Sequence, residues 1–171
     1  VTVLGADLGQ LRRLDESYPG RIVTLAANQA WIDREVEQAD LVIGAVMVRG
    51  AKAPVLVSRA TVFRMKRGAV IVDVAVDQGG CVETTRPTTH SDPLHTVEGV
   101  LHYGVANMPG IVPHTSTLAL TNATLPYIVR LVSAGVERAI RSDPGLAQGV
   151  NVANGRVICK AVADAHGMRV E

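Results

Sequence analysis

Residues 68–80, with the sequence GAVIVDVAVDQGG, constrain the fold more than any other stretch of the chain. The run is rich in β-branched residues, is too short for a typical helix, and is bounded by Gly68 and by the Gly79-Gly80 pair. Such runs are typical of strands buried on both faces of a parallel sheet. Ligands of α/β folds bind beyond the carboxyl ends of such strands, and here that end is residues 77–80. The stretch therefore predicts an α/β fold and a place for chemistry.

Strand and helix patterns alternate along the first 112 residues. We expect further strands over residues 1–4, 21–26, 40–46 and 100–107, helices that begin near Asp7, Asn28 and Ser58, and a loop over residues 81–95. Alternation with short connections predicts a doubly wound parallel sheet with helices on both faces. From residue 113 a long helical pattern follows, with an apolar stripe that runs from Ile128 to Ile140.

Composition excludes several classes of function. The net charge of +1 gives no basic surface for nucleic acid or an anionic membrane, and 47% hydrophobic against 19% charged residues is ordinary for a globular chain. Apolar runs are too short to span a membrane, and no signal peptide opens the chain. The two cysteines have no metal or disulfide spacing, so we expect a cytoplasmic protein without a metal. The chain opens on a strand pattern without an initiator methionine, which suggests a piece of something longer.

Two aspartates on the central stretch have open interpretations. Asp77, at the end of the stretch, either takes part in chemistry or caps a turn, and Asp73 must either find hydrogen-bond partners or face a cleft. Gly79-Gly80 is either a tight turn or a place where a ligand approaches the backbone. Each of the five histidines is more typical of a surface or hydrogen-bonded structural residue than of a catalytic one.

A glycine-rich dinucleotide fingerprint is absent from the chain. The nearest match to G-x-G-x-x-G is residues 5–9, which have the wrong spacing. Asp7, two residues after the first strand, is a better candidate for a helix cap than for a ribose ligand.

Several segments together resemble the alanine dehydrogenase family. They are residues 40–46 (DLVIGAV), 50–54 (GAKAP), 65–81 (MKRGAVIVDVAVDQGGC), 86–89 (RPTT), 105–109 (VANMP) and 113–127 (PHTSTLALTNATLPY). The resemblance runs over nearly the whole chain, in order. The related nicotinamide nucleotide transhydrogenases share the fold but resemble the chain less at residues 77–80 and 86–89.

The resemblance implies a two-domain enzyme of L-alanine catabolism. Such an enzyme oxidatively deaminates L-alanine to pyruvate and ammonia with NAD, in the cytoplasm and usually as a homohexamer. By its position in the motif, Asp77 matches the catalytic aspartate beside the nicotinamide ribose and the substrate. The cofactor-binding positions that the resemblance implies are Val46, Met47, Val74, Asp77, Val105, Asn107 and Met108.

Parts of the family pattern have no counterpart in residues 1–171. The substrate domain with its catalytic lysine and histidine is missing, as are the first strand and its glycine-rich turn. The ribose-binding acid aligns with Gly5, which leaves NAD against NADP open. We therefore expect an incomplete Rossmann-like domain over residues 1–112, a C-terminal helical segment over residues 113–171, and a chain that is inert alone. The alternatives are a non-catalytic oligomerisation or binding module and a protein like the transhydrogenase alpha subunit.

Overall fold

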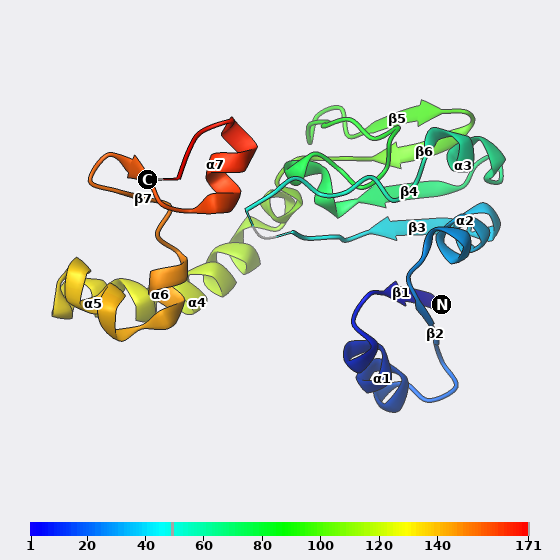
Figure 1. The fold of residues 1–171 in the computed structure, drawn as a ribbon. Helices are drawn as coiled ribbons and strands as arrows, with labels where there is room; N and C mark the ends of the chain where they lie inside the picture. Colours follow the sequence, from blue (N-terminus) through cyan, green and yellow to red (C-terminus); the bar gives the residue numbers. More distant parts are fainter. Residues whose placement is uncertain (49, 171) are drawn as a thin grey trace. The chain divides into compact units, whose positions relative to one another are not determined.

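The computed structural model describes residues 1–48 and 50–170 (Figure 1). The chain divides into two compact units: Val1–Met47 with Ala53–Ala106, and Val48–Lys52 with Asn107–Glu171. The domain boundary expected between residues 112 and 113 stays a prediction.

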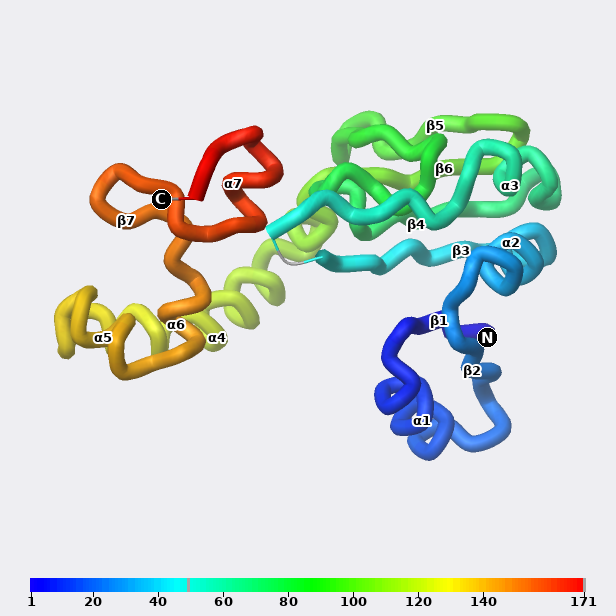
Figure 2. Tube along the Cα trace, in the orientation of Figure 1, coloured from blue at the N-terminus to red at the C-terminus, as the bar shows by residue number. Residues whose placement is uncertain are grey.

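The first unit contains a four-stranded sheet in the order β3-β4-β6-β5. β3 (Leu41–Gly44), β4 (Val70–Asp73) and β6 (Val100–Tyr103) are parallel, whereas β5 (Leu94–Val97) pairs antiparallel with β6. The Cα trace in Figure 2 follows these strands side by side. Gly44 pairs with Asp73, and Val72 pairs with Tyr103, so the carboxyl ends of the three parallel strands lie at one edge.

A second, two-stranded sheet is formed by β1 (Thr2–Gly5) and β2 (Val23–Ala26), which are parallel and joined by α1 (Leu8–Ser17). α2 (Gln29–Gln38) then leads to β3. Among the described residues β1 pairs only with β2, and β3 only with β4. The structure thus confirms the expected α/β fold with an incomplete parallel sheet, because the parallel strands of the described residues are divided between two sheets that do not pair with each other.

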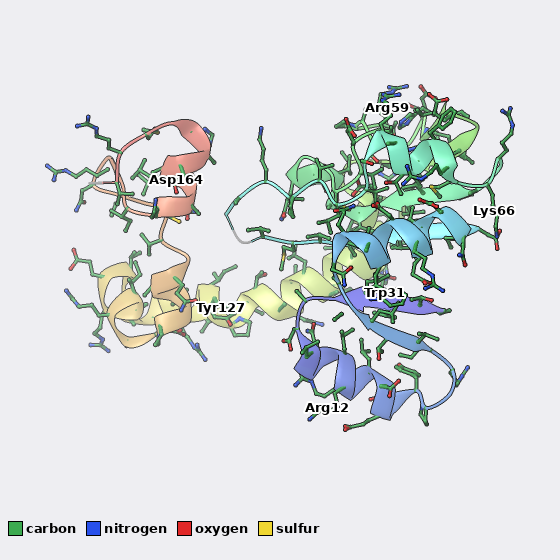
Figure 3. All side chains as sticks on the ribbon, turned by 45° about the vertical axis from the view of Figure 1, so that its right-hand side comes forward. Arg12, Trp31, Arg59, Lys66, Tyr127 and Asp164 are labelled. Atoms are coloured by element: carbon green, nitrogen blue, oxygen red, sulfur yellow. The ribbon has the colours of Figure 1, made fainter. Side chains whose placement is uncertain are left out.

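Side-chain caps explain where the helices of the first unit begin. The Asp7 carboxylate accepts hydrogen bonds from the Gly9 and Gln10 amides at 2.8 and 3.0 Å, which makes this residue a helix cap. Asn28 caps α2 through the Trp31 amide, and Ser58 caps α3 (Arg59–Arg64) through Thr61. Trp31 lies on α2 (Figure 3). The Arg34 guanidinium is 5.0 Å from its ring centroid.

The core of the first unit lies where the β3-β4-β6 sheet meets α2 and α3. Ile71 and Val100 in the sheet and Val62 on α3 are fully buried, and burial of each such side chain contributes about 1.5–3 kcal/mol. Ile32 and Val36, four residues apart on α2, belong to the same cluster, and Leu4 of β1 packs against it. The core therefore holds the sheet edge that carries the candidate site.

The central stretch is shorter as a strand than its apolar run predicts. β4 ends at Asp73, and residues Val74–Gln78 form a 3₁₀ turn, η1, so the prediction of a strand through Val76 was wrong. The cause is the Asp73 side chain, which accepts the Ala75 amide at 3.0 Å and starts the turn. Gly79 and Gly80 then close it in the left-handed region, at φ of 97° and 80°.

Two other boundaries differ from the sequence prediction. β5 lies within and beyond the stretch expected to be a loop, and β6 ends at Tyr103 rather than near residue 107. The cause of the first difference is a hairpin through Glu98 and Gly99, both at positive φ, which pairs residues 94–97 with β6.

The second unit is mostly helical. It contains η2 (Met108–Ile111), α4 (Pro113–Ala134), α5 (Val136–Ser142), α6 (Pro144–Gln148), the short strands β7 (Val152–Ala153) and β8 (Arg156–Val157), and α7 (Lys160–His166). The expected apolar stripe is divided between α4 and α5, because Gly135 at φ 77° breaks the helix. No helix in the described part of the chain is long and apolar enough to cross a membrane.

Candidate functional site

The candidate site lies at the carboxyl edge of the parallel strands in the first unit. β3 continues into Val46 and Met47, β4 into Val74 and Asp77, and β6 into Val105. The register of the three strands brings these segments to one edge. Ligands of open α/β sheets bind at such an edge.

The side chains at this edge offer apolar surface and one exposed acid. Met47 is 70% and Val74 47% exposed, whereas Val105 is fully buried and Val46 packs against the core. Asp77 is an exposed residue of η1. Such an arrangement can take a flat apolar ring and place a carboxylate beside it.

Asn107 and Met108 belong to the second unit. Asn107 has a left-handed backbone at φ 54° and precedes η2, which begins at Met108. They follow Ala106 directly in the chain, and this covalent link is what connects them to the end of β6. The structure therefore brings together five of the seven sequence-predicted residues.

Asp73 is a buried acid that sequence reasoning left undecided. Its carboxylate is fully buried and accepts the amides of Ala75, Cys81 and Val82 at 3.0, 2.9 and 3.2 Å. Of the two alternatives for Asp73, the structure therefore shows the one in which its side chain finds hydrogen-bond partners. These hydrogen bonds offset the cost of burying a carboxylate.

Cys81 lies against this carboxylate, with its Sγ 3.5 Å from the Asp73 Oδ1. Burial, followed by the negative charge of Asp73 and the hydrogen bond to it, raises the pKa of the Cys81 thiol to about 12, while a backbone hydrogen bond from Val46 acts in the opposite direction. Thiolates are the nucleophilic form, so Cys81 is a structural residue.

A second buried network surrounds His102 on β6. Its Nδ1 lies 3.0 Å from the Val100 carbonyl, which can only accept, so this nitrogen donates and Nε2 accepts from the Thr84 hydroxyl at 2.7 Å. His95 stacks on the His102 ring with centroids 4.9 Å apart. Burial is the main cause that lowers the pKa of His102, and the residue is a hydrogen-bonded structural histidine, as the sequence suggested.

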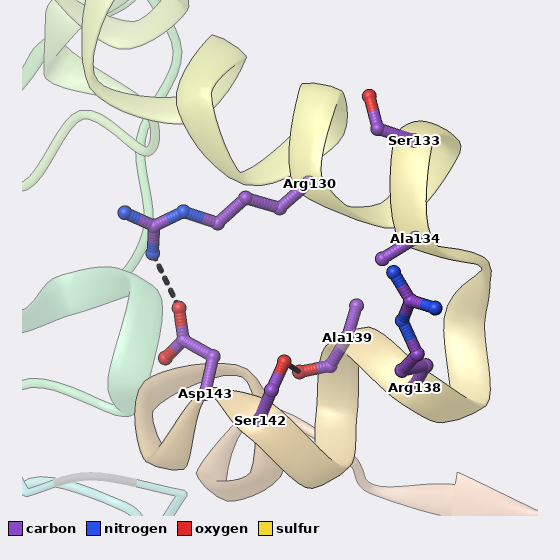
Figure 4. A pocket seen from close by; sticks show the side chains of 7 residues that line it. All are labelled: Arg130, Ser133, Ala134, Arg138, Ala139, Ser142 and Asp143. Carbon is purple, nitrogen blue, oxygen red and sulfur yellow. Dashed lines mark hydrogen bonds and ion pairs between the residues drawn. The ribbon is translucent and has the colours of Figure 1, made fainter.

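The second unit has a hollow of about 240 Å³ between α4 and α5 (Figure 4). An ion pair between Arg130 and Asp143 crosses it, and Asp143 also caps α6 through the amides of Gly145 and Leu146. The Leu146 amide is the largest cause that lowers the pKa of Asp143. None of the sequence-predicted site residues lines this hollow; its walls are Arg130, Ser133, Ala134, Arg138, Ala139, Ser142 and Asp143.

Metal chemistry has no evident ligand set in the part of the chain that the structure describes, where no group of three His, Cys, Asp or Glu side chains is placed to hold an ion. Gly44, Gly80 and Cys81 pack around the Asp73 side chain, and the sequence did not predict this contact. The sequence signal is two glycines, Gly44 and Gly80, that follow neighbouring strand patterns, and glycines alone do not identify the side chain that lies against them.

Comparison with known proteins gives matches over almost the whole chain. The chain is 49% identical over 168 residues to the alanine dehydrogenase of Halomonas elongata, covering 98% of the chain and 45% of that relative. It is 50% identical over 163 residues to the alanine dehydrogenase of Mycolicibacterium smegmatis, covering 95% of the chain and 44% of that relative. The chain thus spans about half the length of the curated relatives it matches.

Solved structures agree with these matches. A structure of L-alanine dehydrogenase superimposes with a TM-score of 0.83 at 47% identity, over 98% of this chain and 46% of the other. A transhydrogenase from Sinorhizobium meliloti shares the fold, with a TM-score of 0.66 at 23% identity over 94% of this chain and 49% of the other. The family model described as alanine dehydrogenase/PNT, C-terminal domain, matches residues 1–160. The chain therefore belongs to the alanine dehydrogenase/PNT C-terminal domain family.

Proposed function

We propose that this chain is the C-terminal, nucleotide-binding part of an NAD-dependent L-alanine dehydrogenase. The observation that carries the proposal is the meeting of Val46, Met47, Val74, Asp77 and Val105 at one edge of the parallel strands, in a chain of this family. Family membership implies a nicotinamide cofactor. NAD, L-alanine and pyruvate are the specific ligands that we propose for it.

The residues at this edge fit the nicotinamide half of such a cofactor. Exposed Met47 and Val74 provide apolar surface for a ring, and the left-handed Gly79 has no side chain that would keep a ligand from the backbone. Asp77 provides hydrogen-bond acceptors for ribose hydroxyls. By their match to the family motif, Asn107 and Met108 complete the proposed set of cofactor-binding residues.

The proposed reaction converts L-alanine, NAD⁺ and water to pyruvate, ammonium, NADH and a proton. A bound nicotinamide would supply the acceptor for a hydride from the alanine α-carbon, and water would hydrolyse the resulting imine of the substrate. The role of Asp77 is electrostatic, because a carboxylate beside the reacting carbon stabilises the positive charge that develops on the amino nitrogen. The structural thiol of Cys81 and the buried His102 take no part in these steps.

Other components are proposed to come from parts of the family pattern that residues 1–171 do not contain. They are the catalytic lysine and histidine of the substrate domain, and the glycine-rich cradle for the pyrophosphate that follows the first strand of the Rossmann-like domain, so the isolated chain is proposed to be inert. A homohexameric assembly and a cytoplasmic location belong to the same proposal. Gly5, at the position of the ribose-binding acid, has no carboxylate to exclude a 2′-phosphate, so preference for NAD over NADP has to be measured.

Complementation with a substrate domain tests the proposal. Residues 1–171 are joined to the preceding part of the Halomonas elongata enzyme, and alanine-dependent NADH formation is followed by absorbance. We expect activity from the joined protein, none from residues 1–171 alone, and a loss of about 100-fold or more in kcat for Asp77→Asn. Asp15→Asn, an exposed acid on α1, is the matched control and should leave kcat unchanged.

Two results would contradict the proposal. Activity of residues 1–171 alone would show that the missing domain is not needed. A folded, joined protein that neither oxidises alanine nor binds NADH in titration calorimetry would favour the non-catalytic module instead.

A further inference from the structure

The buried Asp73 carboxylate joins both ends of the turn that carries Asp77. On one side, its Oδ1 accepts the Ala75 amide at 3.0 Å, at the start of η1. On the other side, its Oδ2 accepts the amides of Cys81 and Val82 at 2.9 and 3.2 Å, just after the turn closes. Residues 75 and 81 are thus held by the two oxygens of one side chain, with Asp77 between them.

The surrounding backbone leaves room for this carboxylate and for little else. A Cβ added to Gly80 would lie 2.9 Å from the Asp73 Oδ2, closer than carbon and oxygen approach without a bond. A Cβ added to Gly44, the β3 residue that pairs with Asp73, would collide with the Cys81 Sγ. Two glycines therefore allow the turn and the end of β3 to close around the Asp73 side chain.

A carboxylate is an expensive choice for a purely space-filling position. Desolvation of its charge costs several kcal/mol in a protein interior, and an apolar side chain of similar size avoids that cost. The carboxylate differs from an apolar side chain in that it can accept several amides at once, in fixed directions. Here those amides belong to the two ends of one turn, so the charged side chain holds the turn in a single conformation.

We propose that Asp73 is a positioning residue, which fixes the conformation of the turn over residues 74–80 and so places the Asp77 carboxylate at the sheet edge. The inference rests on the function proposed above for Asp77, but its first consequence, a fixed turn, can be measured without any activity. Asp73 itself is fully buried and acts through the backbone that it holds.

Cys81 extends the same arrangement to the segment that precedes α3. Its thiol contacts the Asp73 Oδ1 and its amide donates to the Asp73 Oδ2. Its carbonyl accepts the amides of Leu56 and Val57 at 2.8 and 3.1 Å. The Gln78 carbonyl accepts the Ala53 amide at 2.8 Å. The turn is therefore also held from outside, which means that loss of the Asp73 acceptors should loosen the turn without unfolding the sheet.

The test compares Asp73→Asn with a matched control in the joined protein described above. The Asn side chain keeps the size of Asp but replaces one acceptor oxygen with an NH₂ group, which cannot accept an amide hydrogen. The control is Ile71→Ala, which removes a fully buried side chain on the same strand and lowers the melting temperature but leaves both acceptor oxygens of Asp73 in place. Amide hydrogen exchange at residues 75, 81 and 82 and steady-state kinetics are measured for both.

We expect Asp73→Asn to exchange these amides at least about tenfold faster and to lose about 100-fold in kcat, the scale expected for a displacement of a catalytic group by 1 Å. The KM for alanine should change less than kcat, because the substrate-binding groups are proposed to lie on the other domain. Ile71→Ala should keep kcat within about twofold despite its lower melting temperature.

The inference is overturned if Asp73→Asn keeps the protection of these amides, or if its kcat falls no further than that of Ile71→Ala. Should Asp73→Asn fail to fold, Gly44→Ala displaces the Cys81 end of the turn instead, and faster exchange at residues 81 and 82 with an unchanged kcat would overturn the inference. An inactive joined wild type would refute the proposed function, while the exchange measurement would still decide whether Asp73 fixes the turn.

Discussion

The hydrogen bond between Thr84 and His102 provides a quantitative test of the buried polar network. Thr84 is 7% exposed and His102 is fully buried, and the hydroxyl donates to Nε2 over 2.7 Å. Thr84→Val keeps the shape of the side chain but leaves the His102 Nε2 without this donor, which costs about 1–3 kcal/mol for a buried group. At this chain length each kcal/mol lowers the melting temperature by about 2–4 °C, so the expected fall is roughly 2–12 °C.

A double-mutant cycle separates this cost from the loss of packing. His102→Leu leaves the Thr84 hydroxyl unpaired, and the double variant removes both partners, so the two changes should cost less together than their sum by about 0.5–3 kcal/mol. Denaturation by urea, followed by circular dichroism, gives the free energies. Thr96→Val, on the exposed face of β5, is the control and should stay within about 0.5 kcal/mol of wild type. If the free-energy costs of the two single variants simply add up in the double variant, the inferred hydrogen bond between Thr84 and His102 and the inferred His102 tautomer are refuted.

Two further predictions concern ionisable groups outside the proposed site. Burial first, and then the neighbouring His95, lower the pKa of His102, while its hydrogen bond to Val100 and the Asp73 charge raise it by less. Below pH 6.5, the ordinary pKa of histidine, His102 therefore binds a proton more readily in the unfolded chain than in the folded chain. The unfolding free energy should fall as the pH drops through and below 6.5, and it should fall less in His102→Leu. An equal fall in both proteins would contradict this prediction. Because burial raises the pKa of Cys81 to about 12, a thiol reagent at neutral pH should modify the partly exposed Cys159 and leave Cys81 intact until the protein unfolds; rapid labelling of Cys81 in the folded protein would contradict the buried geometry.

The order of strands and helices in the first unit could be predicted because local signals and the final structure agree. Asp7 and Asn28 are predicted to be caps and are caps in the structure, and the helix expected to begin near Ser58 is capped by that residue. The parallel strands follow from apolar runs separated by helical patterns. These features depend on neighbours within a few residues, which a single sequence displays directly.

The features that the sequence did not predict depend on contacts over longer distances. β4 ends at Asp73 because that side chain accepts amides up to nine residues further along the chain, and nothing in an apolar run indicates this. β5 forms because residues 94–97 pair with β6, whereas the sequence prediction placed residues 94 and 95 in a loop rich in threonine and proline. The break at Gly135 is a local signal, but an uninterrupted apolar stripe hides it.

The two aspartates of the central stretch illustrate how burial separates roles that composition leaves equal. Asp73 and Asp77 are four residues apart in one motif, and a regular strand would place both on the same face. The 3₁₀ turn ends this alternation, so that Asp73 is fully buried among backbone amides and Asp77 is exposed at the edge. The carboxylate of Asp73 accepts backbone amides and can therefore fix the backbone conformation. The carboxylate of Asp77 is exposed and can therefore contact a ligand. The proposed division of work between positioning and catalysis therefore follows from the turn, and the turn follows from Asp73 itself.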